Sequence, residues 1–288
     1  MECFFEDAEY YKRSYGAYKK NSNRSVQWPN WMDSFYTNKV INVIAENASR
    51  YNESLKILGV GCGTGEVDHD QVSRLLTRFS KISNTVLEPT DTITEYKALV
   101  KRKPLLSVEW NWRQETFDTY HQSILETSEV PKFHYISAIG VLYYMPNWET
   151  EVMNMYNLLE TGGILMITLM SEDSGFWRLW KRFPELAHHP TVQVNSNQVQ
   201  TFLKTKEIDF EVVQQPSSVD ITCCSIDGDE EGSLLIDFIS HVKHFKAEAP
   251  PNLRDDFMGY IFSRECSHKD KDRILFDNCI EAVLVRKR

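Results

Sequence analysis

The sequence predicts an α/β fold in which helices cover both faces of a mainly parallel sheet. Short apolar runs typical of buried strands alternate with stretches of helical composition along most of the chain. A glycine-rich turn, Gly61-Cys62-Gly63-Thr64-Gly65, stands directly between such a run and a helical stretch. At 288 residues the chain is long enough for one large domain, or for one domain with a smaller lobe.

The N-terminal segment is rich in aromatic residues, and we expect it to be helical. Tyr11, Tyr15 and Tyr18 follow the spacing i, i+4, i+7, which places them on one face of a helix. The periodicity favours packing of this stripe onto a core. The alternative is a helix whose aromatic face closes over a ligand.

The remaining elements follow from apolar runs and their boundaries. Predicted strands cover 55–60, 83–87, 133–138, 164–169, 210–213 and 280–285, and predicted helices cover 66–79, 91–102, 148–159 and 197–206. The last strand directly follows a charged loop, 267–273, and is expected to insert into the sheet, with an antiparallel orientation left open. The stretch 216–262 fits the alternation poorly, so we expect it to form a small lobe together with the N-terminal segment.

Composition and charge exclude several classes of function. The net charge of −9 repels phosphate backbones, so we expect no nucleic-acid partner. No apolar run approaches the ~18 residues that cross a bilayer, and the acidic N-terminus does not resemble a signal peptide. The six cysteines form no CxxC pair. We therefore expect a reduced, cytoplasmic protein with no membrane partner and no structural metal.

The glycine turn and Glu88 predict a nucleoside-containing cofactor. Glycine permits positive φ in a tight turn and lets backbone N–H groups approach a ligand closely. Glu88 ends the second predicted strand, where a carboxylate can accept the hydrogen bonds of both ribose hydroxyls.

The helix start after the turn separates two cofactor types. Dinucleotide sites need a third glycine at position 66, where a helix N-terminus meets a pyrophosphate. Here Glu66 stands at that position and Asp68 follows. These carboxylates would repel a pyrophosphate but suit a cofactor with a cationic amino acid end. The local chemistry therefore favours S-adenosylmethionine over a dinucleotide.

Several sequence blocks together resemble the histamine N-methyltransferase family of class I methyltransferases, and the resemblance runs over nearly the whole chain. The blocks are 5–18, Lys56 to Asp68, Leu142-Tyr143-Tyr144, Ser174-Gly175 with Leu179-Trp180-Lys181, Ile226-Asp227-Gly228, 249–254 and 275–278. The resemblance implies a Rossmann-like core, S-adenosylmethionine as cofactor without a metal, a small-molecule acceptor and a monomer. It divides the chain into a helical substrate lid (1–40), the cofactor-binding core (41–215), a small substrate-binding lobe (216–273) and a last strand returning to the core (274–288).

The resemblance also implies cofactor-binding positions. They are Gly61, Cys62, Gly63, Gly65, Glu88, Pro89, Ile93, Phe117 and Ile139. Two of them depart from the family pattern, because family members have a polar residue in place of Ile93 and a small hydroxyl residue in place of Phe117.

The implied acceptor pocket is lined by aromatic residues, which can enclose a flat or cationic group and exclude water. Its aromatic positions are Phe5, Tyr11, Tyr15, Tyr143, Tyr144, Phe176, Trp180, Phe183 and Phe238. Of three polar family positions, Asn278 matches the asparagine that binds the imidazole. The family glutamate aligns with Arg24 and the family glutamine with Gly140. Arg24 would disfavour a cationic amine and favour an acceptor with a carboxylate, although a solvated surface position is an equal alternative.

The predicted reaction is N-methylation of a small acceptor by in-line displacement. A neutral imidazole needs little help from a base, and no strong base stands at the expected place; His134, His188 and His189 are read as structural or exposed. No residue is clearly assigned as catalytic, and Tyr143, Tyr144 and Asn278 are the candidates. The acceptor is histamine by family, or an imidazole compound with a carboxylate, such as a histidine derivative or carnosine. O-methylation, or cofactor binding without catalysis, are the alternatives.

Overall fold

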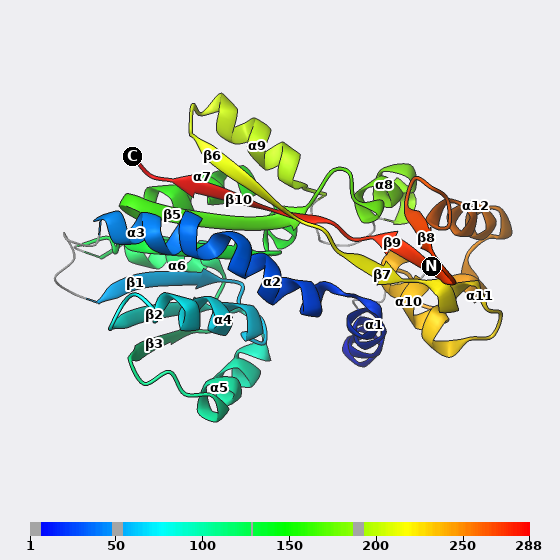
Figure 1. Ribbon diagram of the computed structural model, residues 1–288, viewed down its shortest axis with the longest axis horizontal. Coiled ribbons are helices and arrows are strands. Elements are labelled where there is room, and N and C mark those ends of the chain that lie inside the picture. The colour runs from blue at the N-terminus through cyan, green and yellow to red at the C-terminus, as the bar shows by residue number, and fades with distance from the viewer. Residues whose placement is uncertain (1–6, 48–53, 128, 187–192) are drawn as a thin grey trace.

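The computed structural model describes residues 7–47, 54–127, 129–186 and 193–288 (Figure 1). Its main sheet has seven strands in the order β3-β2-β1-β4-β5-β10-β6. These are β1 (Leu55–Val60), β2 (Ile82–Leu87), β3 (Val108–Arg113), β4 (Phe133–Ile139), β5 (Leu159–Met170), β6 (Phe210–Gln215) and β10 (Ile280–Arg286). Strands β1 to β5 pair in parallel, and β10 runs antiparallel between β5 and β6. The prediction of a mainly parallel sheet is confirmed, and the last strand does insert antiparallel.

Helices cover both faces of this sheet, because its central strands are apolar on both sides. One face carries α2 (Arg24–Tyr36), continued through a π-helical turn (Thr37–Ile41) into α3 (Asn42–Asn47), and also α4 (Glu66–Leu75) and α5 (Thr92–Arg102). The other face carries α6 (Phe117–Leu125), α7 (Trp148–Asn157) and α9 (Ser196–Thr205). Strand β4 is buried along nearly its whole length, as expected of a strand between two helical layers.

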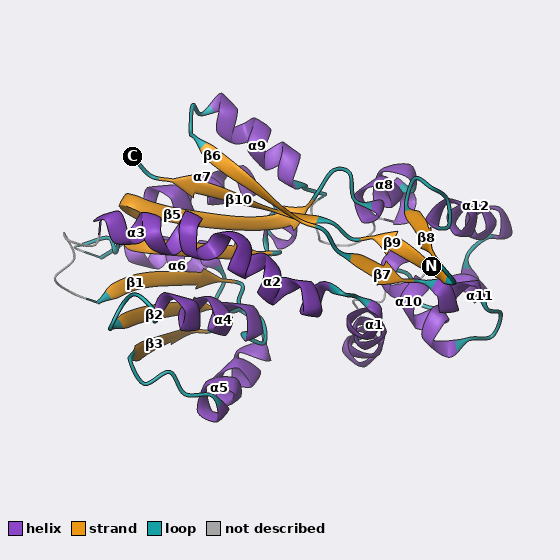
Figure 2. Ribbon diagram, in the orientation of Figure 1, coloured by secondary structure: helices purple, strands orange, loops and turns teal. Residues whose placement is uncertain are grey.

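A small lobe lies beside the carboxyl ends of the parallel strands (Figure 2). Its sheet has the order β7-β9-β8, formed by β7 (Ser218–Asp220), β8 (Ser267–Asp270) and β9 (Arg273–Asp277). Its helices are α1 (Ala8–Asn21), α8 (Gly175–Arg182), α10 (Glu230–Ser240), α11 (Phe245–Glu248) and α12 (Pro251–Ile261), which share one apolar core. Short 3₁₀ turns occur at Leu142–Tyr144, Pro184–Leu186 and Thr222–Ser225.

Two connections, β6 to β7 and β9 to β10, cross side by side between the sheets (Figure 1). The backbone N–H of Asn278 donates to the carbonyl of Ser217 at 2.9 Å and ties these connections together. Asn278 is therefore fixed at the junction of the two lobes.

The structure differs from the expected division of the chain. Within 1–40, α1 packs in the small lobe and α2 on the main sheet, because their apolar faces match different cores. Helix α8 also leaves the core for the small lobe. Residues 273–277 form β9 of the small sheet, so the return to the core begins after Asn278 and not at 274. Strand β3 and helix α6 are elements that the sequence analysis did not predict.

Candidate active site

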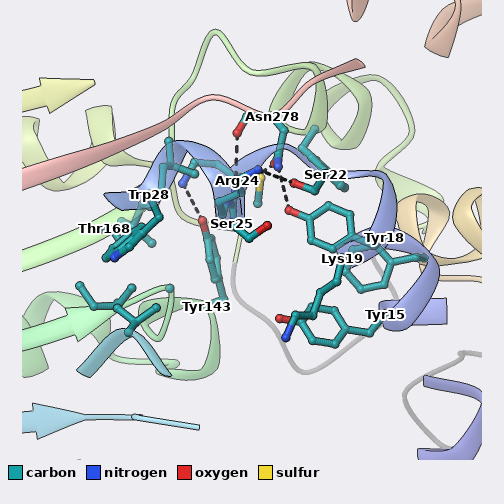
Figure 3. A pocket seen from close by; sticks show the side chains of 18 of the residues that line it. Tyr15, Tyr18, Lys19, Ser22, Arg24, Ser25, Trp28, Tyr143, Thr168 and Asn278 are labelled. Carbon is teal, nitrogen blue, oxygen red and sulfur yellow. Dashed lines mark hydrogen bonds between the residues drawn. The ribbon is translucent and has the colours of Figure 1, made fainter. Parts of the chain in front are cut away.

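A cavity of about 540 Å³ lies between the start of α4 and the small lobe. Residues from both lobes line it, and Figure 3 shows many of their side chains. They are Tyr11, Tyr15, Tyr18, Lys19, Ser22, Arg24, Ser25, Trp28, Glu66, Val67, Ile139, Gly140, Tyr143, Tyr144, Thr168, Leu169, Met170, Phe176, Trp180, Phe238, His241, Asn278 and Ile280. The cavity thus adjoins the glycine turn on one side and aromatic rings on the other.

The glycine turn after β1 has positive φ at Gly61, Gly63 and Gly65. A Cβ atom on Gly61 would meet the Val141 side chain at 2.4 Å, and one on Gly65 would meet the Tyr96 ring at 2.0 Å. A Cβ atom on Gly63 would meet nothing within 4 Å. Packing therefore requires glycine at two positions, whereas Gly63 faces open space that a ligand can fill.

Glu88 fastens this turn to the end of β2. Its Oε2 atom accepts the N–H of Gly63 at 2.7 Å, and its Oε1 atom accepts from the backbone and hydroxyl of Thr90 at 2.9 and 2.6 Å. The side chain is buried, with 5% of the residue surface exposed. A carboxylate oxygen accepts two hydrogen bonds, so Oε2 retains acceptor capacity toward a ribose hydroxyl.

The open space at Gly63, the buried carboxylate of Glu88 and the apolar Ile139 fit a nucleoside without phosphates. These residues could therefore hold S-adenosylmethionine. Among the residues described, no group of three His, Cys, Asp or Glu side chains is placed to hold a metal ion, and no helix has the length and apolarity to cross a membrane.

Other expected cofactor positions are placed differently. Ile139 lines the cavity, whereas Gly61, Cys62, Gly63, Gly65 and Glu88 are not among its lining residues. Ile93 and Phe117 do not line it either, and both are buried in the helical layers. The Cys62 side chain packs against the apolar cluster around Tyr96, and burial raises the pKa of its thiol. Pro89 is exposed beside Glu88. The side chain of Ile93 is fully buried on α5 and does not reach the cavity.

The two carboxylates at the start of α4 also have different environments. Asp68 accepts hydrogen bonds from Tyr96 Oη and from Asn84 Nδ2, and burial raises the pKa of its carboxyl group. Its side chain is buried beside Gly59 of β1 and does not line the cavity, which corrects the expectation that Asp68 faces the cofactor. Glu66 does line the cavity, where it forms an ion pair with Lys19 at 3.3 Å.

The aromatic stripe of α1 forms one wall of the cavity. Tyr11 and Tyr15 stack at 5.8 Å between ring centroids, and Tyr18 stacks on Phe238 at 4.5 Å. Burial raises the pKa of both Tyr11 and Tyr15, which keeps these phenols protonated. The stripe therefore faces the cavity on one side and packs in the small lobe on the other. Packing onto a core and facing a ligand site, the two alternatives for this stripe, thus each describe part of the arrangement.

Tyr143 forms the opposite wall, beyond the end of β4. Its hydroxyl oxygen accepts the backbone N–H of Met170 at 2.7 Å, and burial raises the pKa of the phenol. The hydroxyl proton is then free to be donated within the cavity. Neighbouring Tyr144 lines the cavity with a more exposed ring.

Arg24 lines the cavity at the lobe junction (Figure 3). Its Nη2 atom donates to Oδ1 of Asn278 at 3.0 Å, and Nδ2 of Asn278 donates to the hydroxyl of Tyr18 at 2.8 Å. Both ends of the Asn278 amide are thus engaged within the protein. In the described part of the chain, the buried Nε atom of Arg24 has no hydrogen-bond partner. Arg24 is a lining residue and not a solvated surface side chain.

The remaining expected acceptor positions divide into two groups. Phe176, Trp180, Phe238 and Gly140 line the cavity. Phe183 does not, because it packs against Phe257 and Tyr260 within the small lobe, which corrects the expectation for this residue. Phe5 lies outside the described residues.

Histidines are placed in two distinct environments. His134 is buried on β4, where its Nδ1 atom accepts the backbone N–H of Lys56 at 2.8 Å. Burial lowers the pKa of His134 to about 4. His188 and His189 lie outside the described residues. His241 lines the cavity, as do Lys19, Trp28 and Thr168, and none of these four belongs to a motif in the sequence. No local pattern identifies these four residues, since they come from elements far apart in the sequence.

Comparisons with known proteins identify similar sequences and a similar fold. The family described as "Methyltransferase domain" matches residues 32–215. The histamine N-methyltransferase of Mus musculus is 32% identical over 99% of this chain and 97% of its own length, and that of Cavia porcellus is 30% identical over 99% and 98%. The crystal structure of the YcgJ protein from Bacillus subtilis superimposes with a TM-score of 0.51 at 10% identity, covering 86% of this chain and 99% of that protein.

Proposed function

This chain belongs to the histamine N-methyltransferase family of S-adenosylmethionine-dependent methyltransferases, and on that premise we propose that its acceptor is an imidazole compound bearing a carboxylate. The observation that carries the proposal is the guanidinium of Arg24 inside the cavity. Of the described lining residues, Glu66 is the one with a carboxylate, and it pairs with Lys19. Arg24 therefore offers an unneutralised cation to an acceptor.

Asn278 supports this role by holding the guanidinium in place. Its amide oxygen accepts one hydrogen bond from Nη2 of Arg24, which leaves Nη1 and the second hydrogen of Nη2 as the neighbouring pair of donors, while Nε is buried. Two parallel N–H donors match the two oxygens of a carboxylate. An ammonium group in the same position would be repelled, so histamine is the weaker acceptor in this proposal.

Catalysis in this proposal requires that the protein orient the acceptor nitrogen toward the methyl group and exclude water from the cavity. The cofactor supplies an activated methyl group, so the protein has to hold a neutral acceptor nitrogen in line with it. An imidazole ordinarily has a pKa of about 6.5 and is mostly neutral at pH 7. The aromatic walls of Tyr15, Tyr143 and Phe238 keep the acceptor in a dry environment.

A methyl-transfer panel tests the proposal. Calorimetric titration first measures the affinity for S-adenosylmethionine. Radiolabelled transfer is then compared for histamine, imidazole-4-acetate, histidine, carnosine and small aromatic acids without a ring nitrogen. Histamine and imidazole-4-acetate are a matched pair, because both place one charged group on a short side chain of the same ring.

Transfer to imidazole-4-acetate, histidine or carnosine in preference to histamine is the expected result. Preference for histamine would contradict the proposed role of Arg24. Transfer to the aromatic acids alone would assign O-methylation. Cofactor binding without transfer to any compound would assign a binding protein.

A further inference from the structure

The turn between α10 and α11 holds two histidines in left-handed conformation. His241 ends α10 with φ 61°, and His244 precedes α11 with φ 55°. Non-glycine residues adopt this region only where their surroundings hold them there, although histidine enters it more readily than most. Asp237 fixes the second of them, since its carboxylate accepts the backbone N–H groups of His244 and Phe245, both at 2.9 Å.

The two histidine rings point to different places. The His241 ring lies against Trp180, with 4.8 Å between centroids, and it lines the cavity. The His244 ring instead packs edge-on against Tyr10 at 5.1 Å and does not line the cavity. His241 therefore lies at the cavity, whereas His244 of the same turn lies away from it.

The other described lining groups are poor proton acceptors. Lys19 and Arg24 are cationic donors, and Glu66 is engaged with Lys19 at the exposed rim. Burial raises the pKa of the Tyr11, Tyr15, Tyr143 and Tyr144 phenols. The amide of Asn278 is occupied on both sides. A histidine, in contrast, ordinarily accepts a proton near neutral pH.

We propose that His241 accepts the hydrogen bond, and then the proton, of the acceptor ring nitrogen that is not methylated. This proposal rests on the proposed function. The N–CH₃ bond forms at one ring nitrogen as the S–CH₃ bond breaks. The proton on the other ring nitrogen passes to the unprotonated nitrogen of His241 and from there to solvent. By accepting that N–H in the ground state, His241 also selects the acceptor tautomer, and so decides which ring nitrogen receives the methyl group.

Two variants test this role. His241→Asn removes the imidazole but tolerates the left-handed backbone, and His241→Phe keeps a ring against Trp180. The matched control is His244→Asn, in the same turn and backbone conformation. For each protein, kcat and KM with imidazole-4-acetate, the ratio of the two N-methyl isomers, and the affinities for S-adenosylhomocysteine and for imidazole-4-acetate are measured.

Both His241 variants are expected to lose about 100-fold in kcat/KM, the lower end of the range for a general base. Their products should shift toward a mixture of isomers, while the affinity for S-adenosylhomocysteine stays at the wild-type value. The control should match the wild type in every measurement. If both variants keep the wild-type rate and isomer ratio, the role proposed for His241 is overturned, while the proposed function is unaffected.

Loss of activity in step with loss of S-adenosylhomocysteine binding would make His241 a structural residue and overturn the proposal. If the wild-type protein methylates no imidazole compound, the proposed function fails and this role fails with it. The wild-type panel therefore separates failure of the proposed function from failure of the inference.

Discussion

The Nη2 atom of Arg24 lies 3.0 Å from the amide oxygen of Asn278, although 254 positions separate the two residues in the chain. Arg24 begins α2, and Asn278 lies between β9 and β10. The hydrogen bond therefore links the start of a helix on the main sheet to the junction of the lobes. It fixes the one cavity cation that we assign to an acceptor carboxylate.

Replacing Arg24 should change which acceptor is used. Hydrogen bonds to charged groups contribute about 1.5–3 kcal/mol each, so Arg24→Gln should lower kcat/KM for imidazole-4-acetate by roughly 10- to 100-fold. Arg24→Glu should go further and make histamine the better acceptor, because the sign of the charge is reversed. The measurement is initial-rate kinetics with both acceptors.

Arg13→Gln is the matched control, since Arg13 lies on exposed α1 surface and pairs with Glu230. It should leave both rates unchanged. Asn278→Asp should imitate the loss of Arg24, because a carboxylate at 3.0 Å would neutralise the guanidinium. Equal losses for both acceptors in Arg24→Gln would argue against carboxylate recognition.

Glu88 should determine cofactor affinity. Glu88→Gln keeps the side-chain volume but replaces one acceptor oxygen by a donor. The variant can no longer accept from Gly63, from Thr90 and from a ribose at once. We expect the Kd for S-adenosylhomocysteine to rise by roughly 10- to 100-fold in calorimetric titrations. Glu95→Gln, at an exposed position of α5, serves as the control, and an unchanged Kd in Glu88→Gln would refute the assignment.

Alanine at Gly65 should act mainly on stability, whereas alanine at Gly63 should act mainly on cofactor binding. At Gly65 the new methyl group meets the Tyr96 ring at 2.0 Å with φ at +80°. Overpacking and strain together should lower the unfolding free energy by about 3 kcal/mol. At Gly63 the methyl group enters open space, so strain alone should cost about 1–2 kcal/mol while cofactor binding is blocked.

Urea unfolding and calorimetry separate these effects. The pair of variants would contradict our interpretation of the turn if Gly63→Ala bound S-adenosylhomocysteine as tightly as the wild type. The same holds if Gly65→Ala were as stable as the wild type.

His134 should make the protein less stable in mild acid. Burial lowers its pKa to about 4 in the folded protein, whereas an unfolded histidine has a pKa of about 6.5. Between these values the unfolded chain binds more protons, so the stabilisation is complete above pH 6.5 and is lost as the pH falls toward 4. The loss amounts to about 3 kcal/mol over that window.

Urea unfolding between pH 7.5 and 4.5 measures this dependence. His134→Asn is the comparison, because its Oδ1 atom can still accept the N–H of Lys56 without titrating. Carboxyl groups contribute in both proteins, so the difference between the two curves isolates His134. Parallel curves would show that His134 does not contribute.

Local signals in the sequence are sufficient to predict the parallel core and the glycine turn that we assign to the cofactor. The strand Leu55–Val60 was predicted with the bounds that the structure has, because a continuous apolar run between turn residues has few other solutions. The edge strand Val108–Arg113 was missed, since its alternating exposure leaves no continuous apolar run. The residues of α8 fall within the expected core range 41–215, because nothing in their own sequence indicates which apolar surface they contact.

The sequence by itself determined the fold class, the glycine turn, Glu88 and the family. Each of these depends on neighbours in the chain or on a pattern within one segment. Tertiary structure alone decided that Asp68 and Phe183 face the interior, that Arg24 faces the cavity, and that His241 joins it. The direction of a side chain depends on which distant surface its element packs against, and that packing is a property of the whole chain rather than of any segment.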